Sequence, residues 1–196
     1  MRACWEALHA SFVRSVSTLK ADQNFRTASA REPVLARFES PAGLREYLAT
    51  KSERTEDHEQ KNAIYAALVR AVQARGACAE LASALLWCGL WPALDGIYRH
   101  RLRHFKAEPE ELVAAISAVF TSLVGRMVLG RVQRIAATLT RLLPRELAYK
   151  AAYAIRVSDF ESNPAEEDLA DLLIEVLALD DLAADLENEV NEALMG

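Results

Sequence analysis

Glycine, proline and cysteine are all scarce in this sequence of 196 residues, with seven, six and three copies respectively. The shortage of glycine and proline favours helices, because these are the two residues that destabilise a helix interior most. Three irregularly spaced cysteines do not make a disulfide framework, which indicates a reducing cytoplasm. The N-terminus lacks the layout of a secretory signal, and no apolar run reaches the roughly 18 residues of a membrane span. We therefore expect a soluble, cytoplasmic protein that does not bind a membrane.

Basic residues are absent from the C-terminal segment 157–196, which carries 13 acids. Residues 1–98 carry 12 bases and 11 acids, a net charge of +1, whereas residues 99–156 carry 11 bases and 4 acids, a net charge of +7. The overall charge of −5 therefore conceals two segments of opposite sign. This polarity indicates a basic surface for an anion and an acidic segment with a separate role.

Hydrophobic residues make up 52% of the chain, which is enough for a packed core and excludes wholesale disorder. Ala and Leu dominate, and apolar residues recur at intervals of three and four. These patterns predict an all-α fold, an irregular bundle of about seven to nine helices. We expect an N-terminal, partly irregular segment at 1–60, a helical core with a basic face at 61–156, and an acidic helical segment at 164–196.

The predicted helix ends in the first half depend on capping residues, glycine and proline. A helix over 1–20 is followed by an expected loop at 21–39. Ser40-Pro41 then begins a further helix, because Pro is tolerated at the first helical position. A later helix is predicted to close at Gly89 and Trp91-Pro92.

The second half contains the clearest helical pattern, which begins near Pro109. A second helix is predicted over 131–143, and Pro144 is expected to end or kink it. Residues 157–163 are the expected linker to the acidic segment. The apolar stripe of the first of these helices consists of Leu112, Ile116, Val119, Phe120 and Leu123.

Motifs that carry catalysis are not found. His100 and His104 are one helical turn apart, but a zinc site needs three or four ligands, and the arginines beside them repel a cation. The sequence has neither a glycine-rich phosphate loop nor a serine in a nucleophile elbow. We therefore expect no enzymatic activity, no cofactor and no bound metal.

The predicted helix at 131–143 carries a basic row. Arg131, Arg134, Thr138 and Arg141 recur at intervals of 3, 4 and 3, a spacing that aligns side chains on one helix face. Arginine suits phosphate groups because its planar fork is always charged. The row therefore indicates a nucleic-acid-binding face, although an ordinary solvated helix face has the same pattern.

Further charges and two aromatic residues follow Pro144. Arg145 and Lys150 extend the basic surface, and Tyr149 and Tyr153 lie one turn apart. Aromatic rings of this kind can stack on unpaired bases. The alternative interpretation is that both tyrosines belong to the core.

Two motifs together resemble region two of the ECF-type sigma factors of bacterial RNA polymerase. The first is Glu110-Glu111-Leu112-Val113 with a later Phe120. The second is the segment 132–141, VQRIAATLTR, which is similar to the promoter-contacting helix of that family. With Leu90 to Arg99 as a preceding helix, the resemblance covers about 85–156.

This resemblance implies that Glu110, Glu111, Leu112 and Val113 bind core RNA polymerase. It further implies that the arginines of the basic row face promoter DNA. Because the segment after Asn163 has no base, we expect the chain to lack the complete C-terminal DNA-binding domain of that family.

A second interpretation is a helical adaptor or oligomeric scaffold without enzymatic activity. It depends on apolar residues that recur every four positions in the acidic segment and could seat on a partner protein or on a second copy of the chain. The acidic segment could also fold back on the basic face and suppress DNA binding. The apolar row consists of Leu182, Leu186, Val190 and Leu194.

Overall fold

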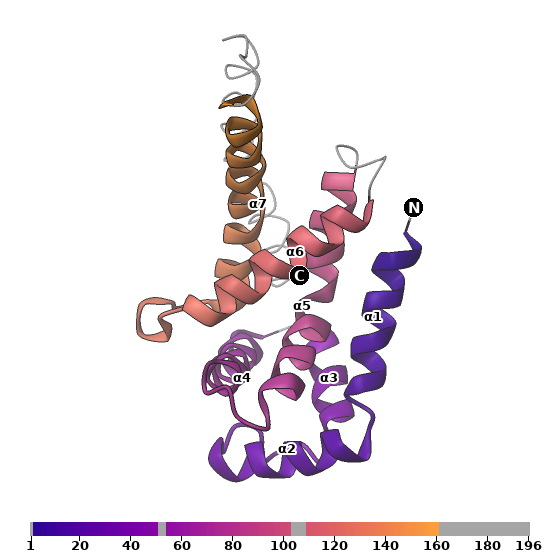
Figure 1. The fold of residues 1–196 in the computed structure, drawn as a ribbon. Coiled ribbons are helices and arrows are strands. Elements are labelled where there is room, and N and C mark those ends of the chain that lie inside the picture. Colours follow the sequence, from indigo (N-terminus) through magenta and orange to yellow (C-terminus); the bar gives the residue numbers. More distant parts are fainter. Residues whose placement is uncertain (1, 51–53, 103–108, 161–196) are drawn as a thin grey trace.

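The computed structural model describes residues 2–50, 54–102 and 109–160, with side chains up to residue 150. The expected all-α fold is confirmed, since these residues form seven α-helices and the 3-10 helix η2, and no strand lies among them. In Figure 1 the N-terminal helices pack around α5, and α7 extends away from them. In chain order the helices are α1 (Ala3–Ser15), α2 (Leu19–Arg31), α3 (Pro41–Ala49), α4 (Thr55–Gln73), α5 (Ala79–Arg101), α6 (Pro109–Arg126), η2 (Leu129–Arg131) and α7 (Ile135–Phe160).

Two of the N-terminal helices begin at a side-chain cap. The hydroxyl of Ser40 accepts the N–H of Gly43 at 3.1 Å, which confirms the predicted helix start at Ser40-Pro41. The loop expected at 21–39 is wrong over 21–31, which belong to α2, whereas residues 32–39 lie outside any helix. Thr18 caps α2 by accepting the N–H of Ala21 at 3.1 Å. The apolar signal was weak because α2 buries only Ala21 and Phe25.

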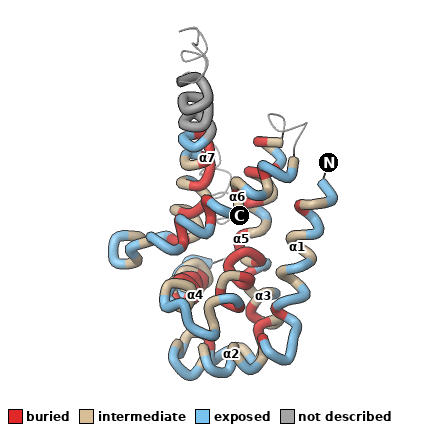
Figure 2. Tube along the Cα trace, in the orientation of Figure 1, coloured by how far each residue is buried: buried red, intermediate tan, exposed pale blue. Residues whose placement is uncertain are grey.

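Helix α5 lies at the centre of the molecule, and Figure 2 shows buried residues along it. The predicted closure at Gly89 and Pro92 is wrong, because α5 continues through both residues to Arg101. Pro92 removes one backbone hydrogen bond, but tertiary burial on both sides of it stabilises the helix. Gly89 instead allows the side chains of α3 and α4 to pack closely on α5. A Cβ at this position would lie 2.9 Å from the Tyr65 hydroxyl and 3.2 Å from the Leu48 Cβ.

By length and composition α5 could also cross a membrane. However, 61% of its most apolar window is buried inside the fold, as expected for a helix of the core. One contiguous core cluster joins side chains from α1 through α7, including Trp5, Leu86, Phe120 and Leu143. The segments around the central helix are therefore packed together by apolar burial.

Stacked aromatic side chains hold α1 against α5. Trp5 is fully buried and stacks on Tyr98 with ring centroids 4.5 Å apart, and on Trp91 with centroids 4.4 Å apart. The indole N–H of Trp5 also donates to Asp95 at 3.1 Å, so the ring is held at its polar edge as well as its faces. The first helix of the sequence is thereby part of the core.

The second half departs from the prediction at both ends of α7. Helix α6 is described from Pro109 to Arg126, and residues 103–108 before it lie outside the described residues. The helix predicted over 131–143 instead begins at Ile135 and passes through Pro144 to Phe160, so Pro144 does not end it. The expected linker over 157–163 is wrong as far as residue 160, which is still helical. Residues 161–163 and the acidic segment 164–196 lie outside the described residues.

Candidate nucleic-acid interface

The basic residues of interest lie on the connection between α6 and α7 and on α7 itself. After α6 ends at Arg126, the chain makes the short helix η2 and then runs extended at Val132, with φ −116° and ψ 115°. Arg131 therefore lies in η2, and Arg134 lies just before α7, where its carbonyl accepts the N–H of Thr138 at 3.0 Å. The predicted row on a single helix is thus wrong for Arg131 and Arg134, which both precede α7.

A different row replaces it along α7. Thr138, Arg141, Arg145 and Tyr149 follow one another along α7 at intervals of 3, 4 and 4, so their side chains share one face, and Arg134 precedes the helix, four residues before Thr138. The three arginines and Tyr149 are exposed, Tyr149 with 70% of its surface, whereas Thr138 is half-buried. We name these five residues the basic face of α7. Because Tyr149 is exposed, it does not belong to the core. The side chain of Tyr153 lies outside the described residues.

Arg131 and Lys150 are also exposed and flank this face. Between residues 126 and 150 the sequence has six bases and a single acid, Glu146. That carboxylate forms an ion pair with Arg126 at 2.5 Å, which ties the end of α6 to α7. The acid is consequently neutralised by a neighbour outside the basic face.

The opposite side of α7 explains why this face is turned outward. Ile135, Leu139 and Leu143 are at most 1% exposed and belong to the core cluster. Pro144 is buried as well, and its carbonyl accepts a hydrogen bond from the Arg101 guanidinium of α5 at 3.4 Å. Burial of an apolar stripe leaves the arginines on the solvent side.

Two side-chain amides of α4 fix the connection between α6 and α7. The Asn62 amide oxygen accepts the N–H of Ile135 at 2.8 Å, and its nitrogen donates to the Gln133 carbonyl at 2.7 Å. Asn62 therefore caps the first turn of α7 from another helix, satisfying a backbone donor that has no partner within α7. This residue was missed because nothing in its local sequence indicates a distant helix end.

The other end of the connection is fixed in the same way. The Gln73 side chain donates to the Val124 carbonyl at 2.9 Å and to the Met127 carbonyl at 2.8 Å. These are carbonyls at the C-terminal end of α6, which lack helical partners. Residues 62 and 73 lie three turns apart on α4, so one helix sets the position of both ends of the basic connection.

The predicted polymerase-contacting residues divide into two groups. Glu110 and Glu111 are exposed in the first turn of α6. Leu112 is 1% exposed and belongs to the core, and Val113 is half-buried against it. Phe120 is buried and packs on Trp87 with ring centroids 4.7 Å apart. Among the four residues predicted to contact the polymerase, Glu110 and Glu111 have the most exposed side chains.

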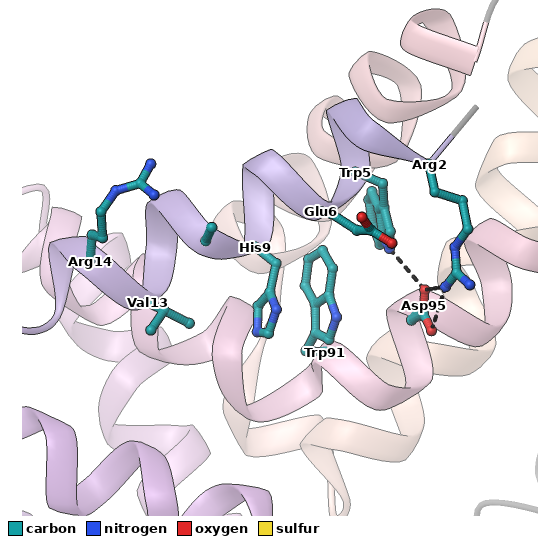
Figure 3. A pocket seen from close by; sticks show the side chains of 9 residues that line it. Arg2, Trp5, Glu6, His9, Val13, Arg14, Trp91 and Asp95 are labelled. Atoms are coloured by element: carbon teal, nitrogen blue, oxygen red, sulfur yellow. Dashed lines mark hydrogen bonds and ion pairs between the residues drawn. The ribbon is translucent and has the colours of Figure 1, made fainter.

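A groove of about 460 Å³ lies between α1 and α5, away from these residues. Figure 3 shows Trp91 in it, between His9 and Trp5, and the His9 ring stacks on Trp91 with centroids 4.1 Å apart. Both faces of the Trp91 ring are therefore covered by the protein's own rings. Desolvation lowers the pKa of His9, and the nearby positive charge of Arg45 lowers it further, whereas Asp95 opposes the shift.

Asp95 forms the polar floor of this groove. Burial raises its pKa, but hydrogen bonds from Arg99 and Arg2 outweigh this effect, so the pKa lies below its ordinary value. Arg99 lies 2.5 Å away on α5 and Arg2 lies 2.9 Å away, so the carboxylate is occupied within the protein. The groove thus contains polar groups with internal partners.

Among the described residues, no three His, Cys, Asp or Glu side chains gather closely enough to bind a metal ion. Burial raises the pKa of Cys88 to about 11, so its thiol is protonated at neutral pH and is a poor metal ligand or nucleophile. His104 lies outside the described residues.

No family model matches this chain, and neither a curated protein nor a solved structure matches it significantly.

Proposed function

We propose that this protein is a cytoplasmic, sigma-factor-like transcription protein that binds promoter DNA through the basic face of α7. Arg131 and Lys150 belong to the same contact surface. The exposed carboxylates Glu110 and Glu111 at the start of α6 contact core RNA polymerase. The observation that carries the proposal is the exposed basic row on a helix whose other side is buried.

The dimensions of this surface suit a nucleic-acid backbone. Residues 134 to 150 span about 24 Å along a helix at 1.5 Å per residue. A DNA strand presents a phosphate about every 3.4 Å along its axis, so about seven phosphates lie within that length. Arginine can bind such oxygens in a bidentate way, and the surrounding segment carries few acids to oppose the approach.

Salt dependence is the measurement that tests the DNA contact. With five bases on the surface, the slope of log affinity against log salt is about −4.5 for a duplex. We expect the double variant Arg134→Glu with Arg141→Glu to lose DNA binding in fluorescence anisotropy at low salt. The matched control is Arg14→Glu with Arg26→Glu, which makes the same charge change at exposed residues of α1 and α2.

The outcomes separate a local contact from a general charge effect. Both variants should retain the helical circular dichroism spectrum and the thermal midpoint, since the substituted residues are exposed. Loss of binding in the α7 variant alone supports the proposed surface. Equal affinities for the two variants and the unmodified protein at matched salt would refute it.

Polymerase binding is tested by retention of purified bacterial core RNA polymerase on the immobilised protein. A genuine sigma factor should displace the polymerase, and Glu110→Lys with Glu111→Lys should weaken retention. Absence of retention by a correctly folded protein would reject the polymerase contact and favour the adaptor or scaffold interpretation. The apolar row on which that alternative depends lies outside the described residues, and it stays a prediction.

A further inference from the structure

We infer that the acidic segment 161–196 of this chain docks on the basic face of α7 and occupies the surface proposed for nucleic acid. The docking itself follows from charge and reach. Only the competition with nucleic acid rests on the proposed function. The occupant is thus a named segment of the same chain.

The charges of the two partners are complementary. The segment 161–196 has 12 acids and no base, whereas residues 126–150 have six bases and one acid. Attraction between such charges at a protein surface is weak for one pair, but it accumulates over a network. A carboxylate already pairs with a guanidinium beside this face, in the contact between Arg126 and Glu146 at 2.5 Å.

The segment is long enough to reach every base of the surface. Helix α7 is described as far as Phe160, and Arg134 lies 26 residues before that residue, about 39 Å away at the rise of a helix. Thirty-six residues follow Phe160. They span about 54 Å if helical, and more than about 100 Å if extended. Docking is therefore compatible with either conformation.

Tethering makes the acidic segment an effective competitor even if its intrinsic affinity is low. A segment linked to its own binding site acts at an effective concentration on the order of millimolar. If the surface is covered in nine of ten molecules, the apparent Kd for nucleic acid rises about tenfold. Salt screens docking and nucleic-acid binding alike, so the difference should shrink as ionic strength rises.

The first experiment detects docking without any nucleic acid. A zero-length carbodiimide cross-linker joins lysine amines to carboxylates in the full chain, and mass spectrometry locates the links in the monomer fraction. Lys150 lies 10 residues before Phe160, about 15 Å along a helix. We therefore expect links from Lys150 to carboxylates at 166–175, at a similar distance after Phe160, and their loss in Lys150→Arg. The exposed pair Lys20 and Glu80, 3.4 Å apart, is the internal positive control.

This experiment has two outcomes that overturn the docking. One is a Lys20–Glu80 link without any link from Lys150 to the acidic segment. The other is acidic-segment links to Lys20 as frequent as those to Lys150, because that result indicates unspecific collisions. Selective links to Lys150 that diminish when a single-stranded oligonucleotide is added support both the docking and the shared surface.

The second experiment replaces every Asp and Glu in 161–196 by Asn or Gln in the full chain. We expect DNA affinity to rise about tenfold at low salt and to approach that of the unmodified protein at high salt. Unchanged affinity, with Arg134→Glu plus Arg141→Glu still abolishing binding, would overturn this inference and leave the proposed function intact. If neither protein binds DNA while the Lys150 links persist, the proposed function fails and the docking stands.

Discussion

Replacing Asn62 by Ala should loosen the start of α7 without removing any charge from the basic face. The substitution removes a cap on the Ile135 N–H and a donor to the Gln133 carbonyl. A lost cap costs about 0.5–2 kcal/mol and a lost neutral hydrogen bond about 0.5–1.5 kcal/mol. Because Asn62 is half-buried, water can replace part of the two lost hydrogen bonds. We therefore expect the unfolding free energy to fall by about 2 kcal/mol. For a chain of this size that lowers the thermal midpoint by about 4–8 °C.

Hydrogen exchange and thermal unfolding measure this effect, locally and globally. Exchange in the peptide covering 128–138 should accelerate, because the first turn of α7 opens more often. Asn62→Asp is the matched control, since it keeps the acceptor for Ile135 and places a negative charge at the positive end of α7. We expect it to lose about half as much stability as Asn62→Ala. Identical exchange at 128–138 in all three proteins would refute the conclusion that Asn62 holds the connection.

Two further predictions concern α5 and the groove. Gly89→Ala should destabilise the fold by about 1–3 kcal/mol relative to Gly96→Ala, because the new methyl group meets the Leu48 Cβ at 3.2 Å while nothing lies within 4 Å at Gly96. Urea unfolding of both variants compares them, and equal stabilities would contradict the packing argument. Burial lowers the pKa of His9 below its ordinary 6.5, so the unfolded chain binds the proton more tightly. The unfolding free energy should therefore decline as pH falls below 6.5, and His9→Gln should decline less between pH 7.5 and 5.5.

The sequence predicted α6 well because its pattern is local. The apolar residues from Leu112 to Leu123 repeat at helical spacing, and every one of them is buried in the structure. Pro109, the residue from which the helix was predicted, lies in α6. The exposed arginines of α7 were likewise readable, since charge next to an apolar stripe indicates the solvent side.

The errors at Pro92, at Pro144 and at the start of α7 share one physical cause, which is that tertiary contacts override local signals. Pro92 and Pro144 were expected to interrupt helices, but each lies in a helix with buried residues on both sides of the proline. The start of α7 was misplaced because it depends on Asn62, more than seventy residues earlier in the chain. No periodicity in the sequence records that two such distant segments meet.

The side chains that hold the connection between α6 and α7 in place are uncharged, which matters for the salt experiment. Asn62 and Gln73 fix the connection between α6 and α7 with neutral amides, and the core side of α7 is apolar. At 0.1 M salt, interactions between exposed charges decay over about 10 Å, but salt hardly weakens a neutral hydrogen bond or apolar burial. A salt titration should therefore weaken phosphate contacts while the position of the basic face stays fixed. The ion pair between Arg126 and Glu146 is a charged contact between α6 and α7, so salt should weaken it as well. The double variant Arg126→Gln with Glu146→Gln would separate this effect of salt on the protein from its effect on nucleic-acid binding.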